Sequence, residues 1–385
     1  MQKYSEKDMF DFIESCREMN FFADVVTPLH VLGVEAAIYH LASEGVKLKG
    51  CIAVMAHSLT GYAVSEESFH VIDGVDTKLV QMSTDYIARS FSQKLQRRWK
   101  RFRFYAKLRK PEPEKPVFYY ITPYKPSFDT IIKLTEIKSG YRLQIIVTDE
   151  GLANYIRSPY GIQKCIIPEW GFYWTLKNVW TILVEERRFV KQVRKAGMIS
   201  DFTILWKQQG KWVPNPACVE AYKAILSQNA REGAYPYYGG AVLLNASLLY
   251  ETKILKKPDD IRIYKEIGRE LKQMGIPLVA KPHPREKELS WYEDLDCIVE
   301  KESAISQEAI LASLNVLPKC VIGDSSTTLV TSAVLFGIKT ISISRLINKK
   351  YLYDAHYFDG FDKSFSNLVL MPESMEELKN MLERL

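Results

Sequence analysis

The chain has 385 residues, of which 47% are hydrophobic and 25% are charged, a balance typical of a folded protein with room for two domains. A formal net charge of +6 is far below that of a polycationic nucleic-acid binder, so nucleic acid is not expected as a partner. The six cysteines form neither a C-x-x-C motif nor a Cys/His cluster, which argues against a zinc site and a disulfide framework. The start of the chain lacks the apolar core of a signal peptide and no apolar run is long enough to span a bilayer, so we expect a cytoplasmic protein.

The first part of the chain predicts helices and strands in alternation. Apolar residues at helical spacing alternate with short apolar runs, and the strand–helix–strand order favours a parallel sheet. The expected helices are 1–20, 29–45, 79–109, 127–138 and 170–198, and the expected strands are 23–26, 50–56, 117–121, 142–148 and 202–206.

The alternation continues after a Gly- and Pro-rich segment, 231–240, where we place a domain boundary. The expected domains are therefore 1–235 and 236–385. In the second domain we expect strands at 241–244, 276–280, near 297, at 319–323 and at 338–343, and helices at 259–274, 305–314, 326–336 and 373–384. The sequence thus predicts an α/β protein with two doubly wound domains, whose ligands lie at the carboxyl ends of the strands.

Two loops at strand ends of the first domain are candidate sites. Thr27, Pro28 and His30 begin a helix whose free backbone N–H groups could bind a substrate, although a simple proline-initiated helix explains them equally well. Asp149 and Glu150 follow a buried strand and precede a glycine. Burial and a like-charged neighbour would raise the pKa of a carboxyl there and make it a candidate general base; the alternative is a solvated acidic turn.

Two loops of the second domain suit a phosphate. His283 and Pro284 lie in the segment KPHPR after a strand, where a preorganised imidazole could meet a leaving phosphate; the alternative is a stiff basic loop. Ser325, Ser326 and Thr327 join a strand to a helix N-terminus, where hydroxyl and N–H groups could bind a phosphate or simply cap the helix. The segment matches neither the P-loop nor the dinucleotide-binding motif.

The segment 94–110 contains nine Lys and Arg residues and no acid, with aromatic residues interleaved. It could contact an anionic membrane face or an acidic glycan. The alternative is a solvated basic helix whose aromatic residues pack on the core.

The order TPLH, DEG, HPR and SST resembles the bacterial sialyltransferases of glycosyltransferase family 52 and the related bacterial polysialyltransferases. The resemblance implies a GT-B fold, in which two Rossmann-like domains face a central cleft, with CMP-sialic acid as the donor and a surface glycan such as lipooligosaccharide or capsule as the acceptor. It also implies inversion at the anomeric carbon without a cofactor or metal. The basic segment 94–110 adds the alternative that a cytoplasmic enzyme lies on the inner face of the membrane.

The same resemblance assigns roles to individual residues. His283 would assist departure of CMP, and the donor phosphate would be bound by Pro284, Ser325, Ser326 and Thr327, with Glu308 near the nucleotide. Segment 244–248 has no acid, whereas the family 52 enzymes carry an Asp just after that strand. Glu150 is therefore the expected base, as in the polysialyltransferases, with Asp149 as the second choice. Another nucleotide-sugar donor and a non-catalytic glycan- or nucleotide-binding protein remain alternatives.

Overall fold

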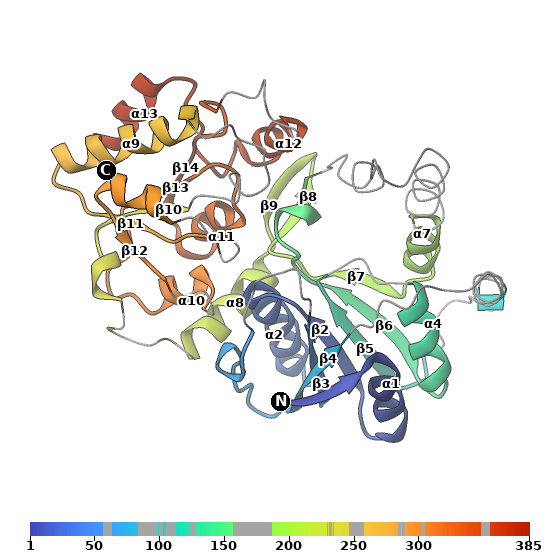
Figure 1. The fold of residues 1–385 in the computed structure, drawn as a ribbon. Coiled ribbons are helices and arrows are strands. Elements are labelled where there is room, and N and C mark those ends of the chain that lie inside the picture. The colour runs from blue at the N-terminus through green and yellow to red at the C-terminus, as the bar shows by residue number, and fades with distance from the viewer. Residues whose placement is uncertain are drawn as a thin grey trace, which may run out of the picture. The chain divides into compact units, whose positions relative to one another are not determined.

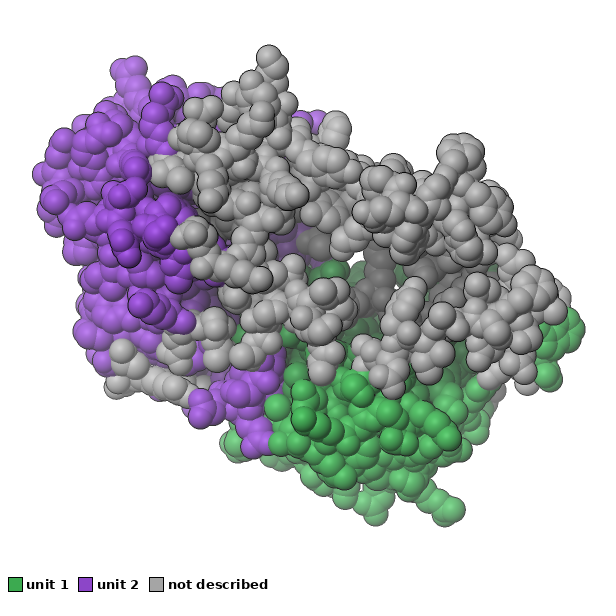
Figure 2. Space-filling model, viewed as in Figure 1, with its two compact units in different colours: residues 1–59, 71–150, 159–203 green, residues 60–70, 151–158, 204–385 purple. Residues whose placement is uncertain are grey.

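The computed structural model describes residues 1–56, 64–83, 99, 103–104, 113–123, 128–156, 187–228, 230, 233, 235–245, 258–283, 286, 289–301, 305–347 and 355–385. The chain forms two compact units (Figure 2). Unit 1 comprises Met1–Leu59, Val71–Glu150 and Pro159–Thr203, and unit 2 comprises Thr60–His70, Gly151–Ser158 and Ile204–Leu385. The domain limits expected from the sequence remain a prediction; the compact units differ from them in residues 60–70, 151–158 and 204–235.

Unit 1 contains a seven-stranded sheet in the order β1-β4-β3-β2-β5-β6-β7 (Figure 1). All of its strand pairs are parallel. Helices α1 and α4 share one buried core with the sheet, and α2 packs on β2 and β5. The strands are β1 (Gln2–Ser5), β2 (Phe21–Val25), β3 (Lys49–Ala56), β4 (Asp76–Ser83), β5 (Val117–Thr122), β6 (Arg142–Val147) and β7 (Ile199–Asp201), and the helices are α1 (Glu6–Ser15), α2 (Pro28–Ser43), α4 (Phe128–Ile137) and α7 (Arg187–Lys195).

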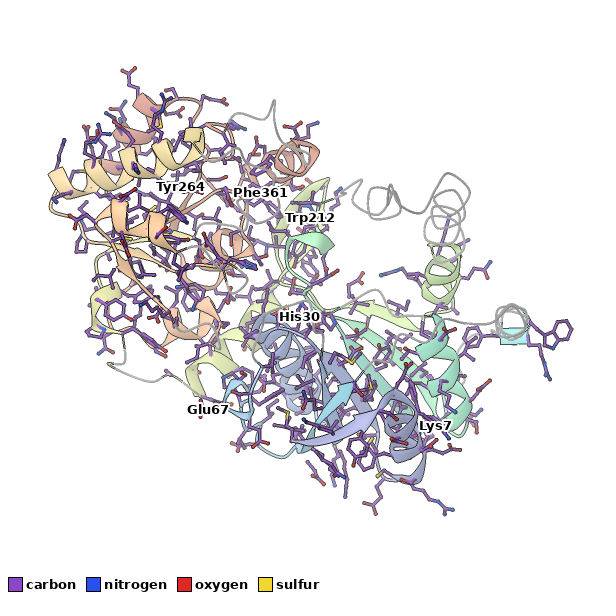
Figure 3. All side chains as sticks on the ribbon, viewed as in Figure 1. Lys7, His30, Glu67, Trp212, Tyr264 and Phe361 are labelled. Carbon is purple, nitrogen blue, oxygen red and sulfur yellow. The ribbon has the colours of Figure 1, made fainter. Side chains whose placement is uncertain are left out.

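Unit 2 contains a five-stranded parallel sheet in the order β12-β11-β10-β13-β14 and the antiparallel hairpin β8-β9. The buried side chains of Tyr264 and Phe361, which Figure 3 labels, belong to this unit. Its strands are β8 (Leu205–Gln208), β9 (Lys211–Pro214), β10 (Val242–Asn245), β11 (Leu278–Ala280), β12 (Ile298–Val299), β13 (Cys320–Gly323) and β14 (Lys339–Ser342). Its helices are α8 (Pro216–Gln228), α9 (Pro258–Gln273), α10 (Gln307–Ala312), α11 (Thr327–Phe336), α12 (Ala355–Phe365) and α13 (Met375–Leu382), with 3-10 turns at Glu66–Ser68, Leu152–Asn154, Pro236–Tyr238 and Ser290–Leu295.

The two parallel sheets confirm the α/β class and the two Rossmann-like halves. The expected central cleft concerns how the halves face each other and remains a prediction. The prediction of a helix from residue 79 is wrong over 79–83, which belong to β4. There Val80 and Met82 alternate with more exposed neighbours, because every second side chain of a strand points into the core. Likewise β1 occupies the start of the expected first helix. The strand expected at 202–206 overlaps β8 only at its start, and β9, α8 and α12 were not predicted.

Candidate functional site

All four loops singled out in the sequence follow the carboxyl ends of parallel strands. The strands concerned are β2 and β6 in unit 1 and β11 and β13 in unit 2. The strand order reverses between β2 and β5 in unit 1 and between β10 and β13 in unit 2. Such a reversal leaves a crevice at the carboxyl edge where ligands bind in open α/β sheets. The loops after β2 and β13 lie at these reversals, and the acidic loop follows β6, next to β5.

The loop after β2 is built around a buried histidine. Thr27 caps α2 by accepting a hydrogen bond from the backbone N–H of His30 at 3.2 Å, and Pro28 occupies the first turn. The imidazole of His30 is buried, and its Nδ1 accepts a hydrogen bond from the Val26 N–H at 3.3 Å (Figure 3). The ring also hydrogen-bonds to the backbone of Glu150. Burial lowers the pKa of His30 to about 4, so the ring is neutral at physiological pH.

The acidic turn after β6 separates its two carboxylates. Asp149 is buried, whereas Glu150 is exposed. The Thr148 N–H donates to the Thr122 carbonyl at 2.9 Å, which continues the β5–β6 ladder up to the turn. Gly151 has φ 99° and ψ −150°, a conformation essentially restricted to glycine. The chain therefore turns sharply directly after the exposed carboxylate.

The serine loop after β13 is held by hydrogen bonds within its own unit. Ser326 caps α11 by accepting a hydrogen bond from the Thr328 N–H at 3.2 Å. The hydroxyl of Thr327 accepts a hydrogen bond from the Leu152 N–H at 3.2 Å. The loop thus places hydroxyl groups at the positive end of a ten-residue helix. It also binds the backbone just after the acidic turn.

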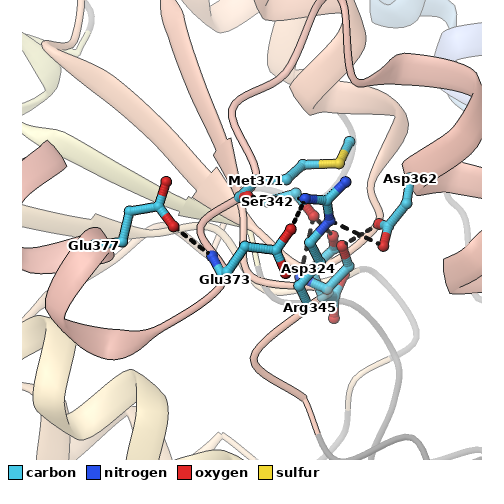
Figure 4. A network of polar contacts seen from close by, with 8 residues as sticks. Asp324, Ser342, Arg345, Asp362, Met371, Glu373 and Glu377 are labelled. Atoms are coloured by element: carbon cyan, nitrogen blue, oxygen red, sulfur yellow. Dashed lines mark hydrogen bonds and ion pairs between the residues drawn. The ribbon is translucent and has the colours of Figure 1, made fainter.

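A polar network that includes Ser342 of β14 holds the backbone at the start of this loop (Figure 4). The Ser342 hydroxyl at the end of β14 donates to the Asp324 carbonyl, and the Asp324 carboxylate accepts a hydrogen bond from the Ser325 N–H. Further along, Arg345 forms ion pairs with Asp362 and Glu373. Asp324 and Ser325 are both buried, so these polar groups serve to hold the loop.

The remaining candidates of unit 2 lie on neighbouring elements. His283 is half-buried just after β11, and its carbonyl accepts a hydrogen bond from the Glu286 N–H at 2.8 Å. Pro284 lies outside the described residues. Glu308 is buried in the first turn of α10, and its Oε1 accepts a hydrogen bond from the Thr331 hydroxyl of α11 at 2.6 Å. Glu308 therefore joins α10 to α11, the helix that follows the serine loop.

Asp24 is a half-buried acid that the sequence analysis missed. It lies in β2, beside the point where the strand order reverses, and its Oδ2 accepts a hydrogen bond from the Tyr120 hydroxyl at 3.0 Å. Its Oδ1 is buried without a hydrogen-bond partner among the described residues. Desolvation raises its pKa to about 6, although hydrogen bonds from Thr122 and Tyr120 oppose the rise. The signal available in the sequence was a single acid inside the apolar strand FFADV.

The basic segment 94–110 lies largely outside the described residues. Within it, Trp99 is 61% exposed, and Phe104 packs against the core of unit 1. In the described part of the chain, no helix is both long and apolar enough to cross a bilayer. The same residues include no group of three His, Cys, Asp or Glu side chains arranged to hold a metal ion.

Comparison with known proteins identifies a family for most of the chain. Residues 93–345, about two thirds of the 385 residues, match the family described as alpha-2,8-polysialyltransferase. The match includes the DEG, HPR and SST motifs and leaves out TPLH. A search of curated proteins found no significant match.

Solved structures give weaker similarities. A Listeria monocytogenes protein described as a UDP-N-acetylglucosamine 2-epimerase has a TM-score of 0.48 at 10% identity, over 94% of this chain and 86% of its own. The wall teichoic acid polymerase TagF has a TM-score of 0.45 at 11% identity, over 98% and 83%. The UDP-GlcNAc 2-epimerase from Methanocaldococcus jannaschii has a TM-score of 0.45 at 11% identity, over 95% and 92%. At such scores these similarities identify no activity for this chain.

Proposed function

Since the chain belongs to the alpha-2,8-polysialyltransferase family and is a glycosyltransferase, we propose that it transfers sialic acid from CMP-sialic acid to a glycan, with inversion at the anomeric carbon. The family match, which includes three of the four motifs, is the observation that carries this proposal. The acceptor would be a surface glycan of the lipooligosaccharide or capsule type. A sialylated, acidic acceptor would suit the basic segment 94–110.

The proposed reaction is a single displacement without a metal or other cofactor. The acceptor hydroxyl oxygen forms a bond to the anomeric carbon of sialic acid while the bond from that carbon to the CMP phosphate breaks. Glu150 takes the hydroxyl proton. Its exposure supports this role, because an acceptor can reach it, whereas Asp149 is buried.

The leaving CMP carries the negative charge that develops in the transition state. His283 and the hydroxyl groups of Ser325, Ser326 and Thr327 would stabilise that charge, together with the N-terminus of α11. Glu308, and Pro284 in the neighbouring loop, would shape the nucleotide side of the site. Thr27 and Pro28 would form part of the acceptor side.

Thermal unfolding with CMP, UDP, GDP or ADP tests the choice of donor. A ligand that binds only the native state raises the unfolding temperature, so CMP should produce the largest rise. Incubation with CMP-sialic acid and a sialylated oligosaccharide should then release CMP and lengthen the oligosaccharide. A preference for UDP would favour the second candidate, a transferase for another nucleotide sugar. CMP binding without turnover would favour a non-catalytic binding protein.

The variant His283→Ala separates binding from chemistry. We expect turnover to fall by roughly 10²- to 10⁴-fold, because acid catalysis and charge stabilisation each contribute on that scale. A His283→Gln variant serves as the matched control, since it retains a hydrogen-bond donor. Near-normal turnover by His283→Ala would remove this residue from the mechanism.

A further inference from the structure

The backbone around Glu150 is held on both sides by side chains from two different loops. Within unit 1, the imidazole of His30 hydrogen-bonds to the backbone of Glu150. Within unit 2, the hydroxyl of Thr327 accepts a hydrogen bond from the Leu152 N–H at 3.2 Å. Only Gly151 lies between the two anchored residues, and the chain passes from unit 1 to unit 2 at that point. The exposed carboxylate of Glu150 therefore lies in a turn whose backbone is hydrogen-bonded at Glu150 and at Leu152.

The partners of His30 define what its ring does. Because Nδ1 accepts the Val26 N–H, a neutral imidazole has its single N–H on Nε2, and that group donates to the Glu150 carbonyl. His30 is only 4% exposed, so the ring is placed by packing as well as by the cap of α2. The strand β2, the helix α2 and the acidic turn are thereby joined through one side chain.

The anchor on the other side belongs to the serine loop. Thr327 is the first residue of α11, next to the cap residue Ser326. Its hydroxyl oxygen accepts from Leu152, and its hydroxyl proton remains available for donation. Gly151 has no side chain that could restrain the turn, and its carbonyl accepts a hydrogen bond from the Asn154 N–H at 3.3 Å. The bonds to Glu150 and Leu152 are the side-chain contacts that hold the residues on either side of it.

We propose that His30 and Thr327 are positioning residues for the turn that carries the base: His30 holds the backbone at Glu150, and Thr327 holds it at Leu152. The proposal rests on the proposed role of Glu150 as the base. It gives His30 a task other than direct substrate binding. It gives Thr327 a second task beside the donor phosphate, so that donor binding and placement of the base share one side chain.

Two variants of His30 test the first anchor. His30→Gln places an amide donor near the position of Nε2 and keeps the bond to Glu150, whereas His30→Asn places an acceptor near Nδ1 and keeps only the bond from Val26. We expect His30→Asn to lower kcat by about 10- to 100-fold at unchanged KM for the donor, because a misplaced catalytic group costs rate on this scale. His30→Gln should restore most of that loss.

Two variants of Thr327 test the second anchor. Thr327→Val has nearly the same shape without the acceptor, and Thr327→Ser retains it. In Thr327→Val the Leu152 amide should exchange hydrogen faster, which mass spectrometry of the peptide 149–155 would detect. Its kcat should fall by about 10-fold, and its Kd for CMP should change less than its kcat. Thr327→Ser should restore both slow exchange and turnover.

The possible failures are distinguishable. If Glu150→Gln retains normal turnover, the proposed base is wrong. If Glu150→Gln is inactive while His30→Asn and Thr327→Val keep the wild-type kcat, the positioning roles are wrong. If Thr327→Val loses CMP affinity as strongly as kcat, with unchanged exchange at Leu152, Thr327 acts on the phosphate alone. Thermal unfolding of each variant identifies any that lose activity simply by failing to fold.

Discussion

The carboxyl edges of the two sheets have different chemistry although their topology is alike. The edge of unit 1 carries titratable groups in or beside the core: Asp24, His30 and Asp149 are buried in whole or in part, and Glu150 is exposed next to them. The edge of unit 2 at β13 carries the hydroxyl groups of the serine loop at a helix N-terminus. Unit 1 thus offers groups that gain and lose protons, and unit 2 offers the hydroxyl groups and helix N-terminus to which we assign the donor phosphate.

The starts of α2 and α11 make the same contrast. Both helices follow a strand at a reversal of strand order, and both have a hydroxyl cap, Thr27 in one and Ser326 in the other. The first turn of α2 contains Pro28, which has no N–H to offer, and a histidine whose ring is already bonded. The first turn of α11 contains the hydroxyl groups of Thr327 and Thr328, while the Thr328 N–H already donates to Ser326. We therefore assign the anion to the start of α11 rather than to the start of α2.

The largest effect should come from removing the exposed carboxylate of unit 1. We expect Glu150→Gln to lower kcat by roughly 10²- to 10⁴-fold, because the acceptor proton then has no base. Its Kd for CMP should stay the same, since CMP is expected to bind at the other edge. Steady-state kinetics and CMP titration measure the two quantities.

Asp149→Asn is the matched control for that variant. The buried carboxyl of Asp149 should affect stability more than turnover. A folded Asp149→Asn protein with the larger loss of kcat would exchange the roles of the two residues.

The second prediction concerns stability as a function of pH, which should depend on unit 1. The pKa of Asp24 is raised from 3.8 to about 6, so its contribution to stability is present below pH 3.8 and is lost as the pH rises to 6. By linkage this loss reaches at most about 3 kcal/mol. Asp24→Asn should therefore gain stability over the wild type between pH 4 and 7, as measured by urea unfolding.

His30 should show the opposite dependence. Its pKa is lowered from 6.5 to about 4, so its contribution is present above pH 6.5 and is lost as the pH falls to 4. In His30→Gln this loss on acidification should disappear. Equal pH profiles of the wild type and both variants would contradict the contrast between the two edges.

The third prediction compares two glycines that serve the two edges differently. Gly151 adopts φ 99°, and at Gly323 an added Cβ would lie 2.6 Å from the Asn245 carbonyl oxygen. We expect each alanine variant to lose roughly 1–3 kcal/mol of unfolding free energy, from backbone strain in the first and from crowding between β13 and β10 in the second. Gly151→Ala should lower kcat, and Gly323→Ala should weaken CMP binding. Gly140→Ala is the neutral control, because a Cβ there would meet no atom within 4 Å.

The sequence was sufficient to predict most of the parallel strands and the four loops at their ends. Apolar runs such as GCIAVMA and CVIG identify buried strands, and capping residues such as Thr27 and Ser326 mark where helices begin. Strand β4 was misread because its sequence, DTKLVQMS, contains few β-branched residues. Only the start of β8 was predicted, as part of a strand at 202–206, because the short strand β9 gave too weak a pattern to be recognised.

The roles of side chains at the edges could be predicted only in part. Residue types at strand ends indicated Glu150 and the serine loop, but the partners of His30 depend on Glu150, which is 120 residues away. Likewise, nothing local to Asp24 shows that Tyr120 on the neighbouring strand donates to it. Contacts of this kind come from strand order, which the sequence pattern did not determine.

The smallest effect on stability and CMP binding should come from changing the cap residues of α2 and α11. It tests most directly whether the two helix starts differ in anion binding. Thr27→Ala and Ser326→Ala each remove a side-chain acceptor from a first-turn N–H, so each should cost about 1 kcal/mol of stability. Only Ser326→Ala should also weaken CMP binding, by roughly 2- to 10-fold for the loss of one hydrogen bond of typical strength. Chemical denaturation and CMP titration of both variants measure the two effects. If Thr27→Ala weakens CMP binding as much as Ser326→Ala does, both helix starts contribute to CMP binding. The assignment of the anion to α11 alone is then wrong.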